Sequence, residues 1–159
     1  MESNNSQWHT LTPNAKPSAE HLVPGLYALA RCWYDRGDLA PAEKIYRLIL
    51  SIDDRVKNIK TGEVVLSALD MARLLMETNR LMEAEHMFLR AINRCTHCLG
   101  QDHAIYAMIL KSYAELLRKM NLAKEADALD VRASQVNAKQ TYKSEPALSD
   151  SSVSSATIV

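Results

Sequence analysis

One segment in the middle of the chain decides the fold: residues 68–91 read ALDMARLLMETNRLMEAEHMFLRA. The apolar residues Ala68, Met71, Ala72 and Leu75 follow the i, i+3, i+4, i+7 spacing that lines one face of an α-helix. Leucine, methionine, alanine, glutamate and arginine dominate the segment, and these residue types favour helix. The first half of the segment is therefore predicted to be an amphipathic α-helix.

The second half of the segment predicts a turn followed by another helix. Asn79 tolerates the left-handed backbone conformation that commonly ends a helix. The apolar stripe after this turn consists of Ala84, Met87, Phe88 and Ala91. Ala72 and Ala84 lie on either side of the turn, and their small side chains would let two antiparallel helices approach closely. We therefore expect a helical hairpin.

The hairpin pattern occurs three times with a period of 42 residues, as Ala30, Ala72 and Ala114 illustrate. Three further columns keep this spacing without a gap: Ala42/Ala84/Ala126, Glu43/Glu85/Asp127 and Gly37/Asn79/Asn121. The first-helix stripes of the outer copies are Leu26, Leu29, Ala30 and Trp33, and Leu110, Tyr113, Ala114 and Leu117. Cys32 shares a column with Leu74 and Leu116, so we expect it to pack inside. Because one hairpin cannot bury both of its faces, the copies should stack.

The expected architecture is an all-α solenoid of three stacked antiparallel hairpins with flexible ends. The hairpins should lie at about 22–56, 64–98 and 105–139, within a folded part spanning 21–138. The flanking segments 1–20 and 140–159 are polar, and the second is dense in serine. We expect both to be disordered, because they offer too little apolar surface to offset the entropy of ordering.

These motifs resemble the tetratricopeptide repeat, whose pattern is large-x2-Leu-small-x2-aromatic followed by Ala-x3-aromatic. The first copy reads Leu26-x2-Leu29-Ala30-x2-Trp33 with Ala42-x3-Tyr46. The period of 42 exceeds the usual ~34 and resembles the kinesin-light-chain type with its extended inter-repeat loop. The segment 99–107 is similar to the loop of that type. Asp130 replaces the aromatic of the third copy, which suggests that the stack ends there.

The resemblance implies a protein-interaction module whose concave surface is lined by the first helix of each repeat. The residues that would form a peptide-binding site on this surface are Tyr27, Arg31, Tyr34, Leu69, Arg73, Met76, Lys111 and Glu115. Arg31 and Arg73 lie one period apart and would pair with an acidic side chain or a C-terminal carboxylate. The tyrosines and Met76 would cover apolar side chains of a protein or peptide partner.

Charge and composition argue against several other functions. The chain has 19 lysine and arginine residues and 19 aspartate and glutamate residues. It therefore lacks the net positive charge that would attract nucleic acids or anionic membranes. We see neither a targeting signal nor an apolar stretch near the ~18 residues of a membrane span, so we expect a cytoplasmic protein. No nucleophile–base pair or phosphate-binding loop is visible, which predicts a protein that is not an enzyme and has no cofactor.

Three alternatives remain open at this stage. The chain could assemble with itself through exposed repeat ends, and its oligomeric state is undetermined. It could be a thiol or metal protein that uses Cys95 and Cys98, although this pair closes a helix, where the helix dipole disfavours a thiolate. The terminal residues Thr157-Ile158-Val159 fit a ligand of PDZ domains.

Overall fold

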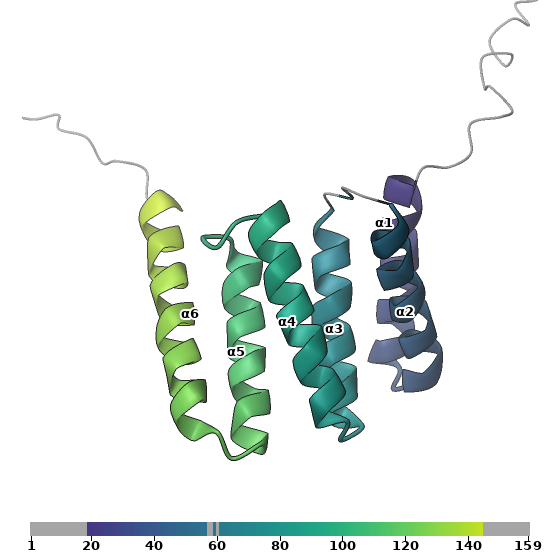
Figure 1. The fold of residues 1–159 in the computed structure, drawn as a ribbon. Helices are drawn as coiled ribbons and strands as arrows, with labels where there is room; N and C mark the ends of the chain where they lie inside the picture. The colour runs from purple at the N-terminus through teal and green to yellow at the C-terminus, as the bar shows by residue number, and fades with distance from the viewer. Residues whose placement is uncertain (1–18, 57–58, 60, 145–159) are drawn as a thin grey trace, which may run out of the picture.

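The structure, a computed structural model, describes residues 19–56, 59 and 61–144, and these residues form six α-helices (Figure 1). The helices are α1 (Ala19–Asp35), α2 (Leu39–Arg55), α3 (Gly62–Glu77), α4 (Leu81–Cys98), α5 (Ala104–Lys119) and α6 (Ala123–Ser144). They pair as α1–α2, α3–α4 and α5–α6, and the three hairpins follow one another in chain order. The predicted all-α stack of three hairpins is confirmed. None of the described helices is both long and apolar enough to cross a membrane.

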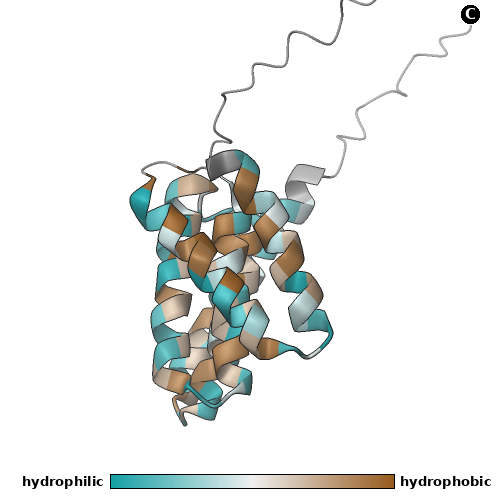
Figure 2. Ribbon diagram, turned by 90° about the vertical axis from the view of Figure 1, so that its right-hand side faces the viewer, coloured by the Kyte–Doolittle hydropathy of each residue, from teal (hydrophilic) through white to brown (hydrophobic). Residues whose placement is uncertain are grey.

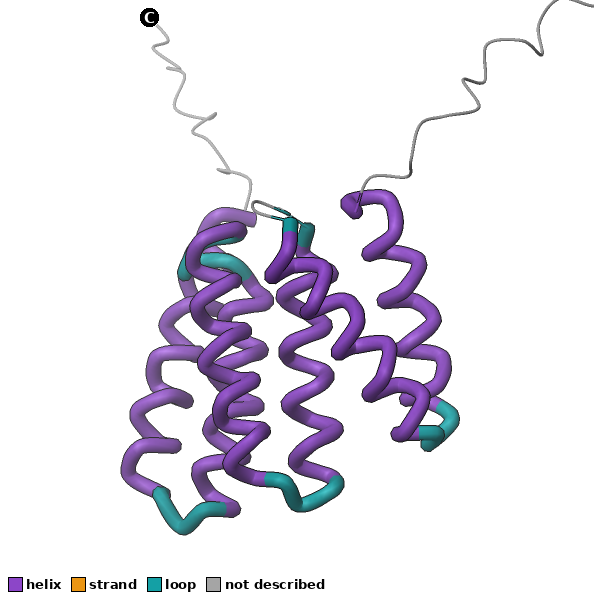
Figure 3. The backbone as a smooth tube through the Cα atoms, turned by 45° about the vertical axis from the view of Figure 1, so that its right-hand side comes forward, coloured by secondary structure: helices purple, strands orange, loops and turns teal. Residues whose placement is uncertain are grey.

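The turn inside each hairpin has the predicted left-handed residue. The φ angles of Gly37, Asn79 and Asn121 are 81°, 58° and 64°. In every hairpin the next residue donates its N–H to a carbonyl five positions earlier: Asp38 to Trp33 (3.0 Å), Arg80 to Leu75 (2.8 Å) and Leu122 to Leu117 (2.9 Å). This is the Schellman pattern, which satisfies carbonyls left over at the helix end. Figure 3 shows the three turns, in teal, along the lower edge of the row of helices and the loop between α4 and α5 along the upper edge.

The loops between hairpins are held by specific contacts. In the loop before α5, Gly100 has a φ of 90°, and the N–H of Ile105 donates to the Nδ1 atom of His103 over 3.2 Å. His103 therefore caps α5 at a position where the first N–H groups lack intrahelical partners. In the loop before α3, the side chain of Ile59 is fully buried.

The interior of each hairpin is built on the alanine columns. All six alanines of the two predicted columns are fully buried: Ala30, Ala72, Ala114, Ala42, Ala84 and Ala126. Tyr46 and Phe88, the aromatics of the first two second helices, are also fully buried. Small residues at the crossing and large ones around it give dense packing.

The stack is curved. The backbones of α1 and α3 approach one another, as do those of α3 and α5, whereas in the described chain no such approach joins α2 to α4 or α4 to α6. The first helices therefore lie on the inner, concave side and the second helices on the outer side.

Two predicted packing residues lie at the surface. Leu29 is 47% exposed, and Cys32 is exposed as well. Their column partners Met71, Leu74 and Leu116 are buried. The reason is that these columns face the preceding hairpin, and α1 has no hairpin before it among the residues described. The prediction was wrong because it treated all three copies as internal.

The last helix also differs from expectation. It runs to Ser144, so residues 140–144 are helical rather than disordered. The side chain of Lys139 donates to Asp102 (3.1 Å), and Gln140 donates to the carbonyl of Asp102, which anchors this end of α6 to the α4–α5 loop. At the other end, residues 19 and 20 already belong to α1. Segments 1–18 and 145–159, including the candidate PDZ ligand, lie outside the described residues.

Candidate functional site

A carboxylate that the sequence did not single out organises the concave side. Asp70 on α3 is only 2% exposed. It accepts hydrogen bonds from the hydroxyl of Tyr27 (2.9 Å) and from the guanidinium groups of Arg31 (3.3 Å) and Arg73 (3.4 Å). Arg73 also donates to the hydroxyl of Ser112 on α5 (2.9 Å). We call these five residues the Asp70 network; it connects all three first helices.

The arginines of this network follow the period of the repeat. Arg31 reaches Asp70 and Arg73 reaches Ser112, and each contact spans 39 residues. Both arginines therefore extend from one hairpin to the same place on the next. Each is about one-third exposed, so part of each guanidinium also faces solvent. Their main observed role is to join consecutive hairpins.

Two tyrosines, Tyr27 in the Asp70 network and Tyr34 beside it, act as neutral hydrogen-bond donors. Burial, followed by the charge of Asp70, raises the pKa of Tyr27 well above its usual value. Burial and the hydrogen bond to Glu77 raise the pKa of Tyr34 in the same direction. Arg31 lies 5.6 Å from the ring centre of Tyr34, within cation–π range. Both hydroxyls stay protonated at neutral pH and hold their carboxylate partners.

The structure divides the eight predicted site residues into two groups. Tyr27, Arg31, Tyr34 and Arg73 are partly exposed, and Lys111 and Glu115 are exposed. Leu69 is fully buried and Met76 is 8% exposed, so these two do not form open surface. Leu69 is buried because it faces the next hairpin, where α5 packs on α3. The expectation that Leu69 and Met76 are accessible to a ligand is thus corrected.

A groove lies between α2 and α4, with the α3 residues Met71 and Leu75 at its floor. Its cavity volume is about 460 Å³, and its apolar lining comes from Leu50, Met71, Leu75, Met82 and Met87. The polar residues at its edge are Arg47, Ser51, Asp54, Glu83 and His86. Met71 and Leu75 were predicted as core of a hairpin, and no separate sequence signal marks the groove.

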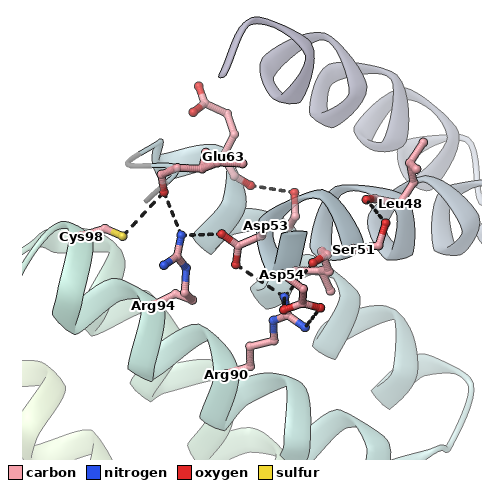
Figure 4. A network of polar contacts seen from close by, with 11 residues as sticks. Leu48, Ser51, Asp53, Asp54, Glu63, Arg90, Arg94 and Cys98 are labelled. Carbon is pink, nitrogen blue, oxygen red and sulfur yellow. Dashed lines mark hydrogen bonds and ion pairs between the residues drawn. The ribbon is translucent and has the colours of Figure 1, made fainter. Parts of the chain in front are cut away.

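Polar contacts bridge the two helices beside this groove (Figure 4). Arg94 on α4 donates to Asp53 on α2 (2.5 Å) and to the carbonyl of Ile59 (2.8 Å). Arg90 donates to Asp54 (2.8 Å) and to the carbonyl of Leu50 (2.9 Å). Burial raises the pKa of Asp53 above its usual value, although Arg94 and Arg90 act in the opposite direction. These side-chain contacts join α2 and α4, whose backbones do not contact each other.

An aromatic pair fills the corresponding space in the next interval of the stack. Tyr113, one period after Met71, stacks on Phe88 with ring centres 5.5 Å apart. Its hydroxyl donates to Glu85 (3.1 Å), and burial together with this carboxylate raises its pKa to about 12. The exchange of methionine for tyrosine at one column therefore explains why the hollow lies between α2 and α4.

Of the two cysteines at the end of α4, Cys95 is not an activated thiol. Cys95 is buried, and burial raises its pKa to about 11, so its thiol is protonated at neutral pH. Cys98 lies 4.0 Å from the carbonyl of Ile59, as a weak donor. Within the described part of the chain, no group of three or more potential metal ligands comes together.

Solved structures with a similar fold are known, although none is close in sequence. No family model and no curated protein matches the sequence. A kinesin-light-chain-type protein of Podosopora anserina with nearly identical TPR-like repeats superposes with a TM-score of 0.66 and 16% identity, over 82% of this chain and 62% of that chain. BtubC (BKLC) from P. vanneervenii gives a TM-score of 0.62 and 15% identity, over 92% of this chain and 73% of that chain.

This chain thus spans less than two-thirds of the length of the Podosopora anserina structure. The predicted likeness to tetratricopeptide repeats of the kinesin-light-chain type is confirmed at the level of the fold.

Proposed function

We propose that this chain is a non-enzymatic interaction module that binds a segment of a partner protein along its concave face. The fold supports the proposal, together with the partly exposed Tyr27, Arg31, Tyr34 and Arg73 on adjacent first helices. Aromatic and arginine side chains on one surface are typical anchors of protein interfaces. The observation that carries the proposal is their alignment across α1 and α3.

The charges on this face refine the chemistry of the ligand. Arg31 and Arg73 share this face with the exposed carboxylates of Asp35 and Glu77, and both arginines are already paired with the buried Asp70. A wholly acidic segment would meet uncompensated negative charge there. We therefore propose a ligand with apolar side chains and hydrogen-bonding groups, in which an acidic residue is at most one element. Affinity should be modest, because three hairpins offer a small area.

The groove between α2 and α4 is a second candidate surface for the same function. Its specific support is the hollow of about 460 Å³ lined by three methionines. Methionine side chains adapt to differently shaped apolar partners. A partner using this groove would insert apolar side chains between the two helices.

One experiment separates the two surfaces. A partner isolated from the native lysate is titrated against wild type, a concave variant (Tyr34→Ala with Glu115→Lys) and a groove variant (Met82→Glu with His86→Glu). All four positions are partly or fully exposed, so the stack should stay folded, which circular dichroism checks. A tenfold or larger loss in the concave variant alone supports the proposal, whereas a loss in the groove variant alone moves the site to the outer side.

The double variant Arg31→Glu with Arg73→Glu is a poor test of the same point. Both arginines hold consecutive hairpins together through Asp70 and Ser112. Their reversal would change stability and binding together, and the two effects would not be separable.

A further inference from the structure

The first hairpin presents an apolar end face with no neighbour in the described chain. On α1 it consists of Leu22, Gly25, Leu29 and Cys32, which are all exposed. Leu48 on α2 lies beside them and is 48% exposed. Seven of the eight equivalent residues in the later hairpins are buried, namely Val64, Ser67, Met71 and Leu74 on α3, and Tyr106, Ile109 and Leu116 on α5. The eighth, Tyr113, is partly buried. This is the surface with which each later hairpin contacts the one before it. Figure 2 looks onto this end of the stack.

We propose that a second copy of this chain covers this face, with the two α1 helices packed antiparallel about a two-fold axis. The inference is independent of the proposed partner site, which lies on a different side of the stack. It rests on the order of residues along α1, on the charges at both ends of the stack and on the area available.

The residues on the face are self-complementary. In an antiparallel pair centred between Gly25 and Leu29, each Leu29 lies opposite the Gly25 of the other copy, and each Leu22 lies opposite Cys32. A Cβ atom added at Gly25 would meet nothing within 4 Å, so the surface there is open to an incoming leucine. Large side chains thus meet small ones on both halves of a two-fold interface, as isologous packing requires.

Charge favours this arrangement over the alternatives between copies. Arg36, just beyond the C-terminal end of α1, is exposed and lies over the ring of Trp33. Antiparallel packing separates the two copies of Arg36 by about 27 Å along the helix axes, well beyond the screening length at physiological salt. A head-to-tail arrangement would instead bury the charged residues Lys111, Glu115 and Arg118 of the opposite end against leucines.

The area sets the expected strength. Packing α1 along its length, with Leu48 at the edge, would bury on the order of 1,000 Å² in total, near the lower limit for a specific interface. We therefore expect a reversible dimer with a dissociation constant in the micromolar range or above. A closed two-fold contact stops at two copies and does not produce filaments.

Sedimentation of the full chain over about 1 µM to about 1 mM tests the proposal. A monomer–dimer equilibrium is expected, and Leu29→Glu should abolish it. At about 1 µM, where wild type is also monomeric, the two should have similar thermal melts, because Leu29 is 47% exposed in the monomer. Gly25→Leu should weaken the dimer at least tenfold by filling the open site. A control, Leu89→Glu at an exposed position of α4, should dimerise as wild type does.

Disulfide trapping tests the register. With an added thiol oxidant, Leu22→Cys should give a cross-linked dimer through the native Cys32 of the other copy. Neither wild type nor Leu22→Cys with Cys32→Ser should cross-link, because identical positions lie about 15 Å apart in this arrangement. The proposal is overturned if the full chain stays monomeric to the highest concentration, or if the dimer survives Leu29→Glu.

Discussion

The two ends of the stack are built from the same columns and finish in opposite ways. At the start, the columns that face the preceding hairpin begin with Leu22, Leu29 and Cys32, which are exposed. At the end, the columns that face the following hairpin finish with Lys111, Glu115 and Arg118, which are exposed too. One open end is apolar, and the other is charged.

The charged end is also paired internally. Arg118 donates to Asp127 (2.9 Å) and to Asp130 (2.5 Å) on α6. Asp130 occupies the column of Tyr46 and Phe88, which are buried in the earlier hairpins. A polar outer face of this kind is typical of the terminal repeats of solenoids. The third hairpin thus has a charged, ion-paired outer face, whereas the first has the apolar face on which we propose that the dimer forms.

The largest expected effect contrasts two residues of one column. Leu74→Ala should lower the free energy of unfolding by about 2–5 kcal/mol, because Leu74 is fully buried and its loss leaves a cavity. Cys32→Ala, one period earlier at the apolar end, should change it by less than about 0.5 kcal/mol. Urea unfolding at low protein concentration measures both. Equal losses would show that Cys32 is covered in solution, and the contrast between the ends would fail.

The hairpin interiors should be alike where the ends differ. Ala72→Leu and Ala114→Leu should each cost about 1–3 kcal/mol, since both alanines are fully buried at a close crossing of helices. The exposed Ala128 on α6 provides the control, and its replacement by leucine should be nearly neutral. Thermal melts compare the three variants. A neutral Ala72→Leu would count against close pairing of the helices around this column.

The two junctions between hairpins should differ in how much polar contact stabilises them. Asp70→Asn weakens the hydrogen bonds that Tyr27, Arg31 and Arg73 donate to residue 70 at the first junction. It should lower the free energy of unfolding by about 1–3 kcal/mol, given the partial exposure of both arginines. Ser112→Ala, at the same column of the second junction, should cost about 0.5–1.5 kcal/mol. Chemical denaturation ranks the two, and the reverse order would place the stronger polar junction at the charged end.

The smallest change in stability should come from making the charged end resemble the apolar one. Lys111→Leu alters an exposed residue and should change the free energy of unfolding by less than about 0.5 kcal/mol. It should nevertheless promote larger assemblies, because both ends of the stack would then offer apolar surface. Light scattering across a concentration series detects them. If assembly stays as in wild type, one lysine is not what closes this end.

Periodicity predicted what every copy shares. The columns located the hairpins, the left-handed turn residues and the buried alanines, because these depend on local spacing alone. The same reasoning erred at Leu29 and Cys32, since a column does not reveal whether a neighbour exists on that side. It also missed the role of Asp70, whose column partners are Ala28 and Ser112. A search for an acidic residue 39 positions after each arginine would have found it.

The candidate site was the least predictable part. The tyrosines and arginines were chosen for their residue types, and only three-dimensional contacts show that the arginines already bind within the chain. The groove between α2 and α4 depends on Met71 in place of the tyrosine found at position 113, a difference in side-chain volume that leaves the helical pattern unchanged.

The turn and junction contacts also bear on the order in which the chain folds during synthesis. The tyrosine–carboxylate bonds Tyr27–Asp70 and Tyr34–Glu77 each span 43 residues, about one repeat. The entropy cost of closing a loop grows with its length, so these contacts cost less than contacts across the whole chain would. Proteins dominated by contacts between residues near in sequence fold fast. As a ribosome releases the chain from its N-terminus, the first hairpin can close, and the second can dock onto it before the third has emerged. Of the three described hairpins, the one with the charged outer face emerges last and docks onto two hairpins that have already begun to fold.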